Sequence, residues 1–334
     1  MNYNYKEAKK ILKIIKKSES ILLNCHRGPD PDSIGSTLAL FNVLRNMGKK
    51  VDVVCPSKEL YEGVEFLDNY DLIKRNVNFF DFDFKNYDLF IILDSSSWDM
   101  VTSDIKAPRP SIPSIVVDHH YTNSRYGDIN IVDEKASSTG EIIFRLFEDW
   151  RIKIDLNTAN ALLTAIISDT GLFRYPNQTE KTYSAFIKLL EMGADKDLIV
   201  SRLYRNNDIK LLKFWGEVLT RLKVDKENKF VYSAIPYEIY RKFGKLRNAK
   251  DSSCDLFAQS TSETDFGFFV IEEEKNEISV SFRSRNYFDT SRIALELGGG
   301  GHKAASGAKI HGKSFKSALN LILNVARKYT KISQ

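Results

Sequence analysis

Four short apolar runs in the first half of the chain restrict its fold more than any other feature. They cover residues 21–23, 51–54, 89–93 and 115–117, and they show little or no polar alternation. Strands that are covered on both faces have this pattern, whereas half-exposed strands alternate apolar and polar residues. A helical pattern that starts near Ser33 and stops at Gly48 separates the first two runs. We therefore expect an α/β fold with a doubly wound, mostly parallel sheet.

Histidines and aspartates follow directly after three of these runs. His26, Asp30 and Asp32 lie in the loop after the first run, Asp94 follows the third, and residues 118–120 (Asp-His-His) follow the fourth. Ligands of open α/β sheets bind beyond the carboxyl ends of the strands, so these side chains should meet at one edge. Histidine and aspartate together are typical ligands of paired divalent metal ions. The sequence therefore predicts metal-assisted hydrolysis of a phosphate ester.

Length, charge and cysteine content narrow the class of protein. The chain has 334 residues, a net charge of +5 and three cysteines. Because single cores rarely grow past ~250 residues, two domains are expected. The charge is mild, which favours a small phosphorylated ligand over long nucleic acid. No stretch approaches the ~20 apolar residues of a membrane span, so no membrane partner is expected. The cysteines are odd in number and lack C-x-x-C spacing, which favours a reducing, cytoplasmic location.

The second half divides into helices followed by strands. Residues 138–141 (Ser-Thr-Gly-Glu) fit a capping box, and helical patterns continue to about Arg205. We expect a catalytic domain over 1–205, a connecting helix over 206–222, and a smaller α/β domain with a mixed sheet over 223–334. In the smaller domain, we expect a hairpin of 268–271 with 278–282 around a turn at 272–276, then a last helix near 315–326.

The ordered motifs closely resemble those of the DHH phosphoesterases over nearly the whole chain. The resemblance is to the two-domain branch, nanoRNase and pAp-phosphatase-like, in which a DHH domain precedes a smaller DHH-associated domain. The matching motifs are His26-x-x-x-Asp30-x-Asp32-x-x-Gly35-Ser36, Asp94, Asp118-His119-His120, residues 136–139 with Asp169-Thr170-Gly171, residues 280–284, and residues 298–308. A lone Asp-His-His is weak evidence, whereas this ordered set is specific.

The resemblance implies a site with two metal ions. His26, Asp30 and Asp94 would hold one ion, and Asp32, Asp94, His119 and Asp169 the other, with Asp94 bridging. Two ions ~3.5–4 Å apart need such a shared carboxylate. The oxygen-rich ligand set favours Mn²⁺ over Zn²⁺ as the cofactor.

The resemblance also implies which residues contact the substrate. His120 would contact the phosphate or the leaving oxygen as electrophile or proton donor, and Asp118 would orient a histidine. Arg283 would pair with a phosphate through its fork of donors, beside Ser284. The run with Gly299, Gly300 and Gly301 would let the backbone approach a nucleotide, and His302 would lie against phosphate or base.

Three positions depart from the family pattern. Pro31 stands where the first motif commonly has glycine, and Ala165 replaces a frequent glycine ahead of Asp169. The serines after Asp94 are not followed by the arginine that many relatives have. None of these departures removes a predicted metal ligand, although the missing arginine bears on contacts near Asp94.

The leading hypothesis is a manganese-dependent phosphoesterase of short nucleotides. It would degrade RNA fragments of a few residues and remove the 3′-phosphate of adenosine 3′,5′-bisphosphate. The alternative is a phosphodiesterase of cyclic di-AMP or linear pApA, which would use the same metal ligands. A RecJ-type exonuclease would need further domains, and the related inorganic pyrophosphatases lack the glycine-run domain. A nucleotide-binding regulator without catalysis is disfavoured because all six ligands are present. The resemblance also implies a homodimer.

Overall fold

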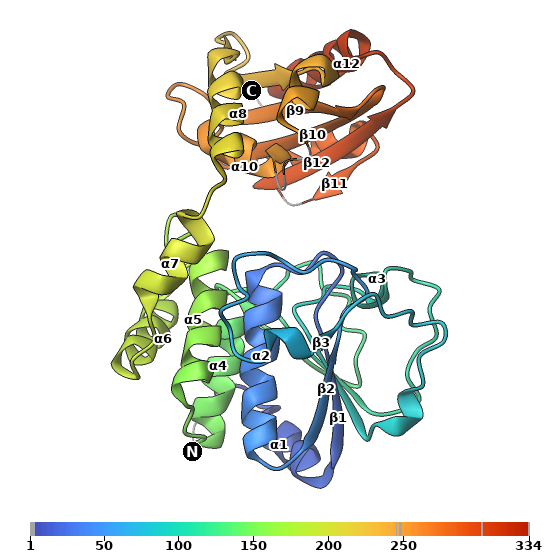
Figure 1. The fold of residues 1–334 in the computed structure, drawn as a ribbon, viewed down its shortest axis with the longest axis vertical. Coiled ribbons are helices and arrows are strands. Elements are labelled where there is room, and N and C mark those ends of the chain that lie inside the picture. The colour runs from blue at the N-terminus through green and yellow to red at the C-terminus, as the bar shows by residue number, and fades with distance from the viewer. Residues whose placement is uncertain (1–3, 245, 247–248, 302, 333–334) are drawn as a thin grey trace. The chain divides into compact units, whose positions relative to one another are not determined.

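The chain folds into two compact units. A computed structural model describes residues 4–244, 246, 249–301 and 303–332, and the boundary between the units falls after Asn206 (Figure 1). Each unit has its own sheet and its own apolar core. The site predicted from the histidines and aspartates belongs to the first unit, and the glycine run belongs to the second.

The sheet of the first unit is parallel throughout. Its described strands lie in the order β3-β2-β1-β4-β5-β6, and every neighbouring pair is parallel. The predicted α/β fold with a parallel sheet is confirmed. The strands are β1 (Ser20–Asn24), β2 (Lys50–Val54), β3 (Ile73–Lys74), β4 (Leu89–Leu93), β5 (Ser114–Asp118) and β6 (Ile129–Val132).

Both faces of this sheet are covered, which explains why its strands lack alternation. Long helices cover one face, and their apolar sides pack on residues such as Ile21, Leu23 and Ile91. Aromatic side chains of loops and short helices, among them Trp98, cover the other face. The helices are α1 (Ala8–Lys17), α2 (Pro31–Asn46), η1 (Tyr70–Leu72), η2 (Phe84–Asn86), α3 (Trp98–Thr102), α4 (Thr139–Trp150), α5 (Leu156–Asp169), α6 (Glu180–Glu191) and α7 (Lys196–Tyr204).

The start of α4 differs from the predicted capping box in one respect. Ser138 accepts a hydrogen bond from the backbone N–H of Glu141 at 3.0 Å, as in a capping box. The Glu141 carboxylate, however, accepts from the N–H and hydroxyl of Ser137 rather than from Ser138. Glu141 is fully buried and also pairs with Arg145, so tertiary contacts fix its direction.

The second unit contains a mixed sheet, as predicted. Its described strands lie in the order β11-β12-β10-β9-β8-β7, and only β8 and β9 pair in parallel. The expected hairpin is longer than predicted, because its strands continue to a two-residue turn at 275–276. Asn276 has a φ of 65° there, which asparagine tolerates better than most residues. The strands are β7 (Lys223–Asp225), β8 (Phe230–Ile235), β9 (Phe266–Glu274), β10 (Glu277–Ser284), β11 (Gly300–Gly301) and β12 (Ala305–His311).

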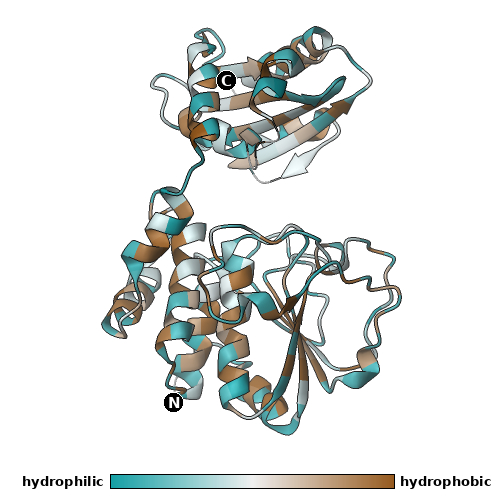
Figure 2. Ribbon diagram, viewed as in Figure 1, coloured by the Kyte–Doolittle hydropathy of each residue, from teal (hydrophilic) through white to brown (hydrophobic). Residues whose placement is uncertain are grey.

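Helices pack on both faces of the second sheet, and their apolar residues form its two cores. In Figure 2 the ribbons of these helices carry brown, apolar segments beside teal, polar ones. The helix predicted as a connection buries Phe214 and Val218 in the core of this unit. None of the described helices is long and apolar enough to cross a membrane. One face carries α8 (Ile209–Thr220), α9 (Tyr237–Tyr240), η3 (Arg241–Phe243) and α10 (Ala249–Phe257); the other carries α11 (Ser291–Glu296) and α12 (Phe315–Ile332).

Candidate active site

The candidate site lies where the strand order of the parallel sheet reverses. Strands β1 and β4 are neighbours, and the chain leaves them toward opposite sides of the sheet. In open α/β sheets, ligands bind beyond the carboxyl ends of the strands at such a switch point. His26 follows β1, and Asp94 follows β4. Asp30 caps the N-terminus of α2, and Asp32 lies in its first turn. Figure 1 shows α2 packed beside β1 and β2.

His26, Asp30 and Asp94 form one set of potential metal ligands. The Nε2 atom of His26 lies 3.8 Å from Oδ1 of Asp30 and 3.5 Å from Oδ2 of Asp94. The His26 Nδ1 atom is 2.9 Å from the backbone carbonyl of Arg27. With a proton on Nδ1 to donate to that carbonyl, the Nε2 lone pair faces the carboxylates. This is the tautomer that a metal-binding imidazole needs.

Asp32, His119 and Asp169 form a second set. The Nε2 atom of His119 lies 3.8 Å from Oδ2 of Asp32 and 3.4 Å from Oδ2 of Asp169. The side chains come from the N-terminus of α2, the end of β5 and the C-terminus of α5. Segments far apart in the sequence thus meet at one point.

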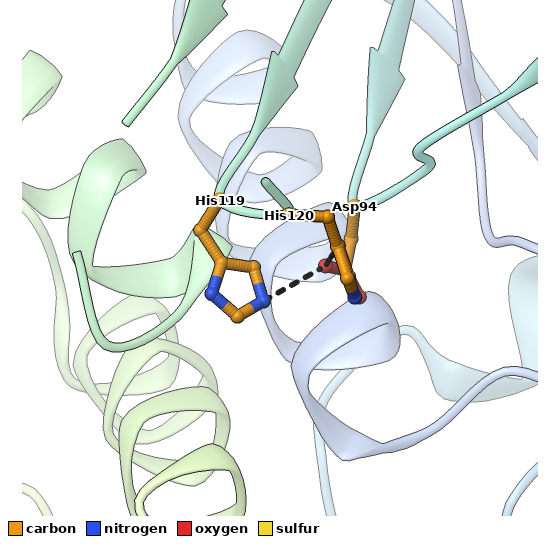
Figure 3. Close-up of side chains that lie close together, drawn as sticks. All are labelled: Asp94, His119 and His120. Carbon is orange, nitrogen blue, oxygen red and sulfur yellow. Dashed lines mark ion pairs between the residues drawn. The ribbon is translucent and has the colours of Figure 1, made fainter. Parts of the chain in front are cut away.

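Asp94 lies between the two sets. Its Oδ2 atom faces His26, and its Oδ1 atom lies 3.7 Å from Nε2 of His119. Figure 3 shows the His119 ring pointing toward the Asp94 carboxylate. Oδ2 of Asp94 is buried and has no hydrogen-bond partner among the described residues. Asp94 belongs to the first set and also forms a further group with His119 and His120. It therefore lies beside both sets, and its bridging of two ions stays a prediction.

The charge of the site fits positive ions. Burial, followed by the charges of Asp94 and Asp169, raises the pKa of Asp32 well above its usual value. Burial, and then the neighbouring carboxylates, raises the pKa of Asp169 to about 7, although His119 acts against this. Buried carboxylates that repel one another are expected to be protonated or to bind cations. The oxygen and imidazole donors suit a divalent ion.

Backbone amides at the start of α4 fix the position of Asp32. Its carboxylate accepts from the N–H groups of Thr139 at 2.7 Å and Gly140 at 2.9 Å. The Thr139 hydroxyl also donates to Oδ1 of Asp94 at 3.0 Å. Sequence reasoning placed residues 136–139 among the family motifs and Ser138 in a capping box, but it gave them no contact with the predicted metal ligands. Their position at a helix N-terminus, where unpaired N–H groups attract anions, is the signal for this contact.

Asp118 holds His120. Its Oδ1 atom lies 2.7 Å from Nδ1 of His120 and also accepts from the backbone N–H of His119. Its Oδ2 atom accepts from the side-chain amide of Asn123 at 2.6 Å. Although burial acts against protonation, the hydrogen bond to Asp118 raises the pKa of His120 to about 9. In the metal-free site, this shift favours the protonated form of His120 at neutral pH. Asn123 carried no prediction from the sequence.

Arg283 is engaged within the second unit. Its Nε atom donates to Asp255 at 2.6 Å, and an Nη atom lies 3.5 Å from Asp251. Both carboxylates belong to α10, so helix packing sets this arrangement. The Oγ atom of Ser284 is buried and has no partner among the described residues. Binding of phosphate by Arg283 and Ser284 stays a prediction. To bind phosphate, Arg283 would have to divide its N–H donors between the phosphate and the two aspartates.

The glycine run forms β11 and the turn before it. Gly300 and Gly301 pair with Gly307 and Ser306 of β12. Gly299 precedes them, and a Cβ atom there would lie 2.1 Å from the carbonyl oxygen of Gly307. The structure thus places Gly299, Gly300 and Gly301 on a sheet edge of the second unit. His302 lies outside the described residues.

Comparison with known proteins identifies the two units. Residues 20–166 match the DHH family, N-terminal domain, and residues 228–331 match the DHHA1 domain. The chain belongs to the DHH family. Together the two matches cover most of the chain and agree with the resemblance seen in its motifs.

Curated relatives and a solved structure extend this family assignment. The bifunctional oligoribonuclease and PAP phosphatase NrnA of Bacillus subtilis is 26% identical over 90% of this chain and 92% of that protein. The cyclic-di-AMP phosphodiesterase GdpP of the same species is 24% identical over 95% of this chain but only 49% of that protein. A crystal structure of an exopolyphosphatase-related protein from Bacteroides fragilis has a TM-score of 0.88 at 26% identity, covering 98% and 97% of the two chains. Family membership makes this chain a phosphoric ester hydrolase.

Proposed function

We propose that this chain hydrolyses short nucleotides with two bound Mn²⁺ ions. It acts as an oligoribonuclease on RNA fragments of a few residues and as a 3′-phosphatase on adenosine 3′,5′-bisphosphate. The observation that carries this proposal is the pair of ligand sets that share Asp94 at the switch point of the sheet. Similarity to NrnA along nearly the full length of both proteins supports the substrate class.

Each residue of the site has a distinct task in this proposal. His26, Asp30 and Asp94 hold one ion, and Asp32, Asp94, His119 and Asp169 hold the other. When bound, such ions activate water and neutralise negative charge on the phosphoryl oxygens. His120, protonated and held by Asp118, donates a hydrogen bond or a proton to the phosphate or leaving oxygen. The amides of Thr139 and Gly140 keep the Asp32 carboxylate in place.

A second candidate is hydrolysis of cyclic di-AMP or linear pApA. It is supported by the similarity to GdpP over 95% of this chain. The match covers only about half of GdpP, whereas NrnA is matched along nearly its full length. This difference favours the oligoribonuclease and phosphatase activities.

Parallel rate measurements test the proposal. Turnover of adenosine 3′,5′-bisphosphate, pApA, cyclic di-AMP and a five-nucleotide RNA is compared under identical conditions, with Mn²⁺ and with a chelator. We expect turnover of the RNA and the bisphosphate, its loss with chelator, and near-abolition by Asp94→Ala. Asp71→Ala, an exposed aspartate of the same unit, is the matched control. Fast turnover of cyclic di-AMP alone would favour the second candidate, and absence of turnover on all four would refute both.

A further inference from the structure

The first helix concentrates the positive charge of the chain. Residues 6–17 contain six lysines and one glutamate, a net charge of +5. The whole chain also has a net charge of +5, so its remaining acids and bases balance. The mild net charge of the whole chain favours a small ligand over long nucleic acid. Charge gathered in one segment acts locally, however, and reverses this expectation.

Five of these lysines share one side of α1, which we call the lysine face. With 3.6 residues per turn, they fall within about 120° of the helix circumference. All five are exposed, whereas Ala8, Ile11 and Ile15 are buried in the core of the first unit. The buried apolar side therefore turns the lysine face toward solvent. Its members are Lys9, Lys10, Lys13, Lys16 and Lys17.

Among the described residues, no carboxylate forms an ion pair with the lysine face. Glu7 lies 3.7 Å from Lys6. Asp88, beyond the end of the helix, accepts from the backbone N–H groups of Glu19 and Ser20. The five ammonium groups therefore repel one another, and like charges three or four positions apart destabilise a helix.

The start of α1 gains nothing from its lysines. Lys9 and Lys10 are the second and third residues of the helix, where unpaired N–H groups and the helix dipole favour acids. The first turn contains no acid, and Glu7 makes no side-chain cap. Glutamate at these positions would suit the dipole and keep the surface soluble, so neither folding nor solubility requires lysine there. These lysines therefore indicate an anion outside the protein.

A nucleic-acid strand fits the lysine face better than a membrane does. Helices that lie on membranes insert their apolar side, whereas the apolar side of α1 is buried in the protein core. Lys9, Lys13 and Lys17 are spaced by about 6 Å along the helix axis, on the scale of successive phosphates in a strand. The helix has no aromatic residue on which a base could stack, so contact with phosphate alone is expected.

We propose that the lysine face binds the phosphate backbone of single-stranded RNA longer than the proposed substrates, independently of base sequence. The C-terminus of α1 lies next to the amino end of β1, whereas the candidate site lies at the carboxyl ends of the strands (Figure 1). RNA on the lysine face is therefore held outside the candidate site. The choice of RNA as the polyanion rests on the proposed function, and the surface itself does not.

Fluorescence anisotropy with a labelled twenty-nucleotide RNA tests this assignment. The full chain is used in chelator, without divalent ions. We expect the triple variant Lys9→Gln/Lys13→Gln/Lys16→Gln to raise Kd about 10- to 100-fold at about 0.1 M salt. The slope of log K against log salt should fall by ~2, because three phosphate contacts are lost at ~0.7 each. Oligoadenylate and oligouridylate of this length should bind the wild type within about threefold of each other.

A second triple variant, Lys181→Gln/Lys210→Gln/Lys316→Gln, is the matched control. It removes three exposed lysines from three other helices, so Kd should stay within about threefold of the wild type. Glutamine keeps the helix propensity of lysine. Thermal unfolding of the α1 variant should therefore occur at the wild-type temperature or above it, since repulsion is relieved. Its kcat/KM on adenosine 3′,5′-bisphosphate should be unchanged.

Equal losses of affinity in both triple variants would overturn the assignment, because total charge would then explain binding. An unchanged Kd in the α1 variant would overturn it as well. Tighter binding to phosphatidylserine vesicles than to the RNA, lost in the same variant, would replace RNA with a membrane surface. A protein that binds the long RNA through this face but hydrolyses no substrate would contradict only the proposed function. Hydrolysis with RNA binding unaltered in the α1 variant would contradict only the lysine face.

Discussion

Asp94 adopts a backbone conformation that non-glycine residues avoid. Its φ is 52°, and its carboxylate is almost fully buried. A residue held in this region costs about 1–3 kcal/mol, which the surrounding structure must offset. The conformation turns the side chain from the end of β4 to a point between His26 and His119. The strained backbone of Asp94 is therefore associated with the position of its carboxylate between the two ligand sets.

The variant Asp118→Asn should alter the protonation and orientation of His120 while leaving metal binding unchanged. The amide keeps the shape of the carboxylate but removes the charge that raises the pKa of His120. We expect kcat to fall ~10²- to 10³-fold, as when an acid–base histidine loses its carboxylate partner. If protonated His120 is the active form, the alkaline limb of the kcat profile should move to lower pH.

Steady-state kinetics and metal analysis of the same preparation check this prediction. Metal content should stay at the wild-type level, because Asp118 belongs to neither ligand set. A variant that loses its metal together with its activity would assign Asp118 a different role.

At the level of secondary-structure elements, small residues allow the helices α2, α4 and α5 to pack closely beside the site. A Cβ atom at Gly35 of α2 would lie 2.5 Å from the carbonyl oxygen of Ala161 on α5. A Cβ atom at Gly140 of α4 would lie 2.4 Å from the Cβ atom of Ala165. This close approach brings the amides at the start of α4 to Asp32. Ala165 fits this crossing because its neighbour at 140 is glycine.

Gly35→Ala should therefore destabilise the protein and disturb the site. Because the added methyl group meets backbone, the helices must shift, and we expect a loss of about 1–3 kcal/mol in the free energy of unfolding. Gly216→Ala in α8 is the matched control: it has open space and should stabilise by about 0.5–1 kcal/mol. Urea denaturation of both variants measures the difference, and equal effects would contradict the packing argument.

The sequence predicted those elements whose signal is local. Uninterrupted apolar runs predicted the parallel sheet, and acids directly after strands predicted which side chains meet at its edge. No local sequence pattern indicated the contacts that depend on helix packing. The hydrogen bonds from Thr139 to Asp32 and the ion pairs of Arg283 with Asp251 and Asp255 depend on how distant elements pack.

Across the whole molecule, stability without metal should fall as pH rises from about 5.5 to 8. The folded-state pKa values of Asp32, Asp169 and His120 are all raised, so the folded protein binds protons that the unfolded chain releases. The stabilisation from these groups is present at low pH and is lost as pH rises through the folded pKa values. The change should be ~1–3 kcal/mol.

Thermal unfolding in chelator across this pH range measures the effect. Addition of Mn²⁺ should raise Tm most at the alkaline end, where the carboxylates are ionised and ligands compete least with protons. A metal-free protein that became more stable toward pH 8 would contradict this account of the site.

The most direct test of the central claim is the number of ions that the site binds. Metal-free protein is titrated with Mn²⁺ by calorimetry, and bound metal is counted after desalting. We predict two ions per chain for the wild type, with both sites weakened by Asp94→Ala, because its carboxylate serves both ligand sets. Binding of a single ion, or of two ions with unchanged affinity in Asp94→Ala, would contradict a pair of metals joined by this residue.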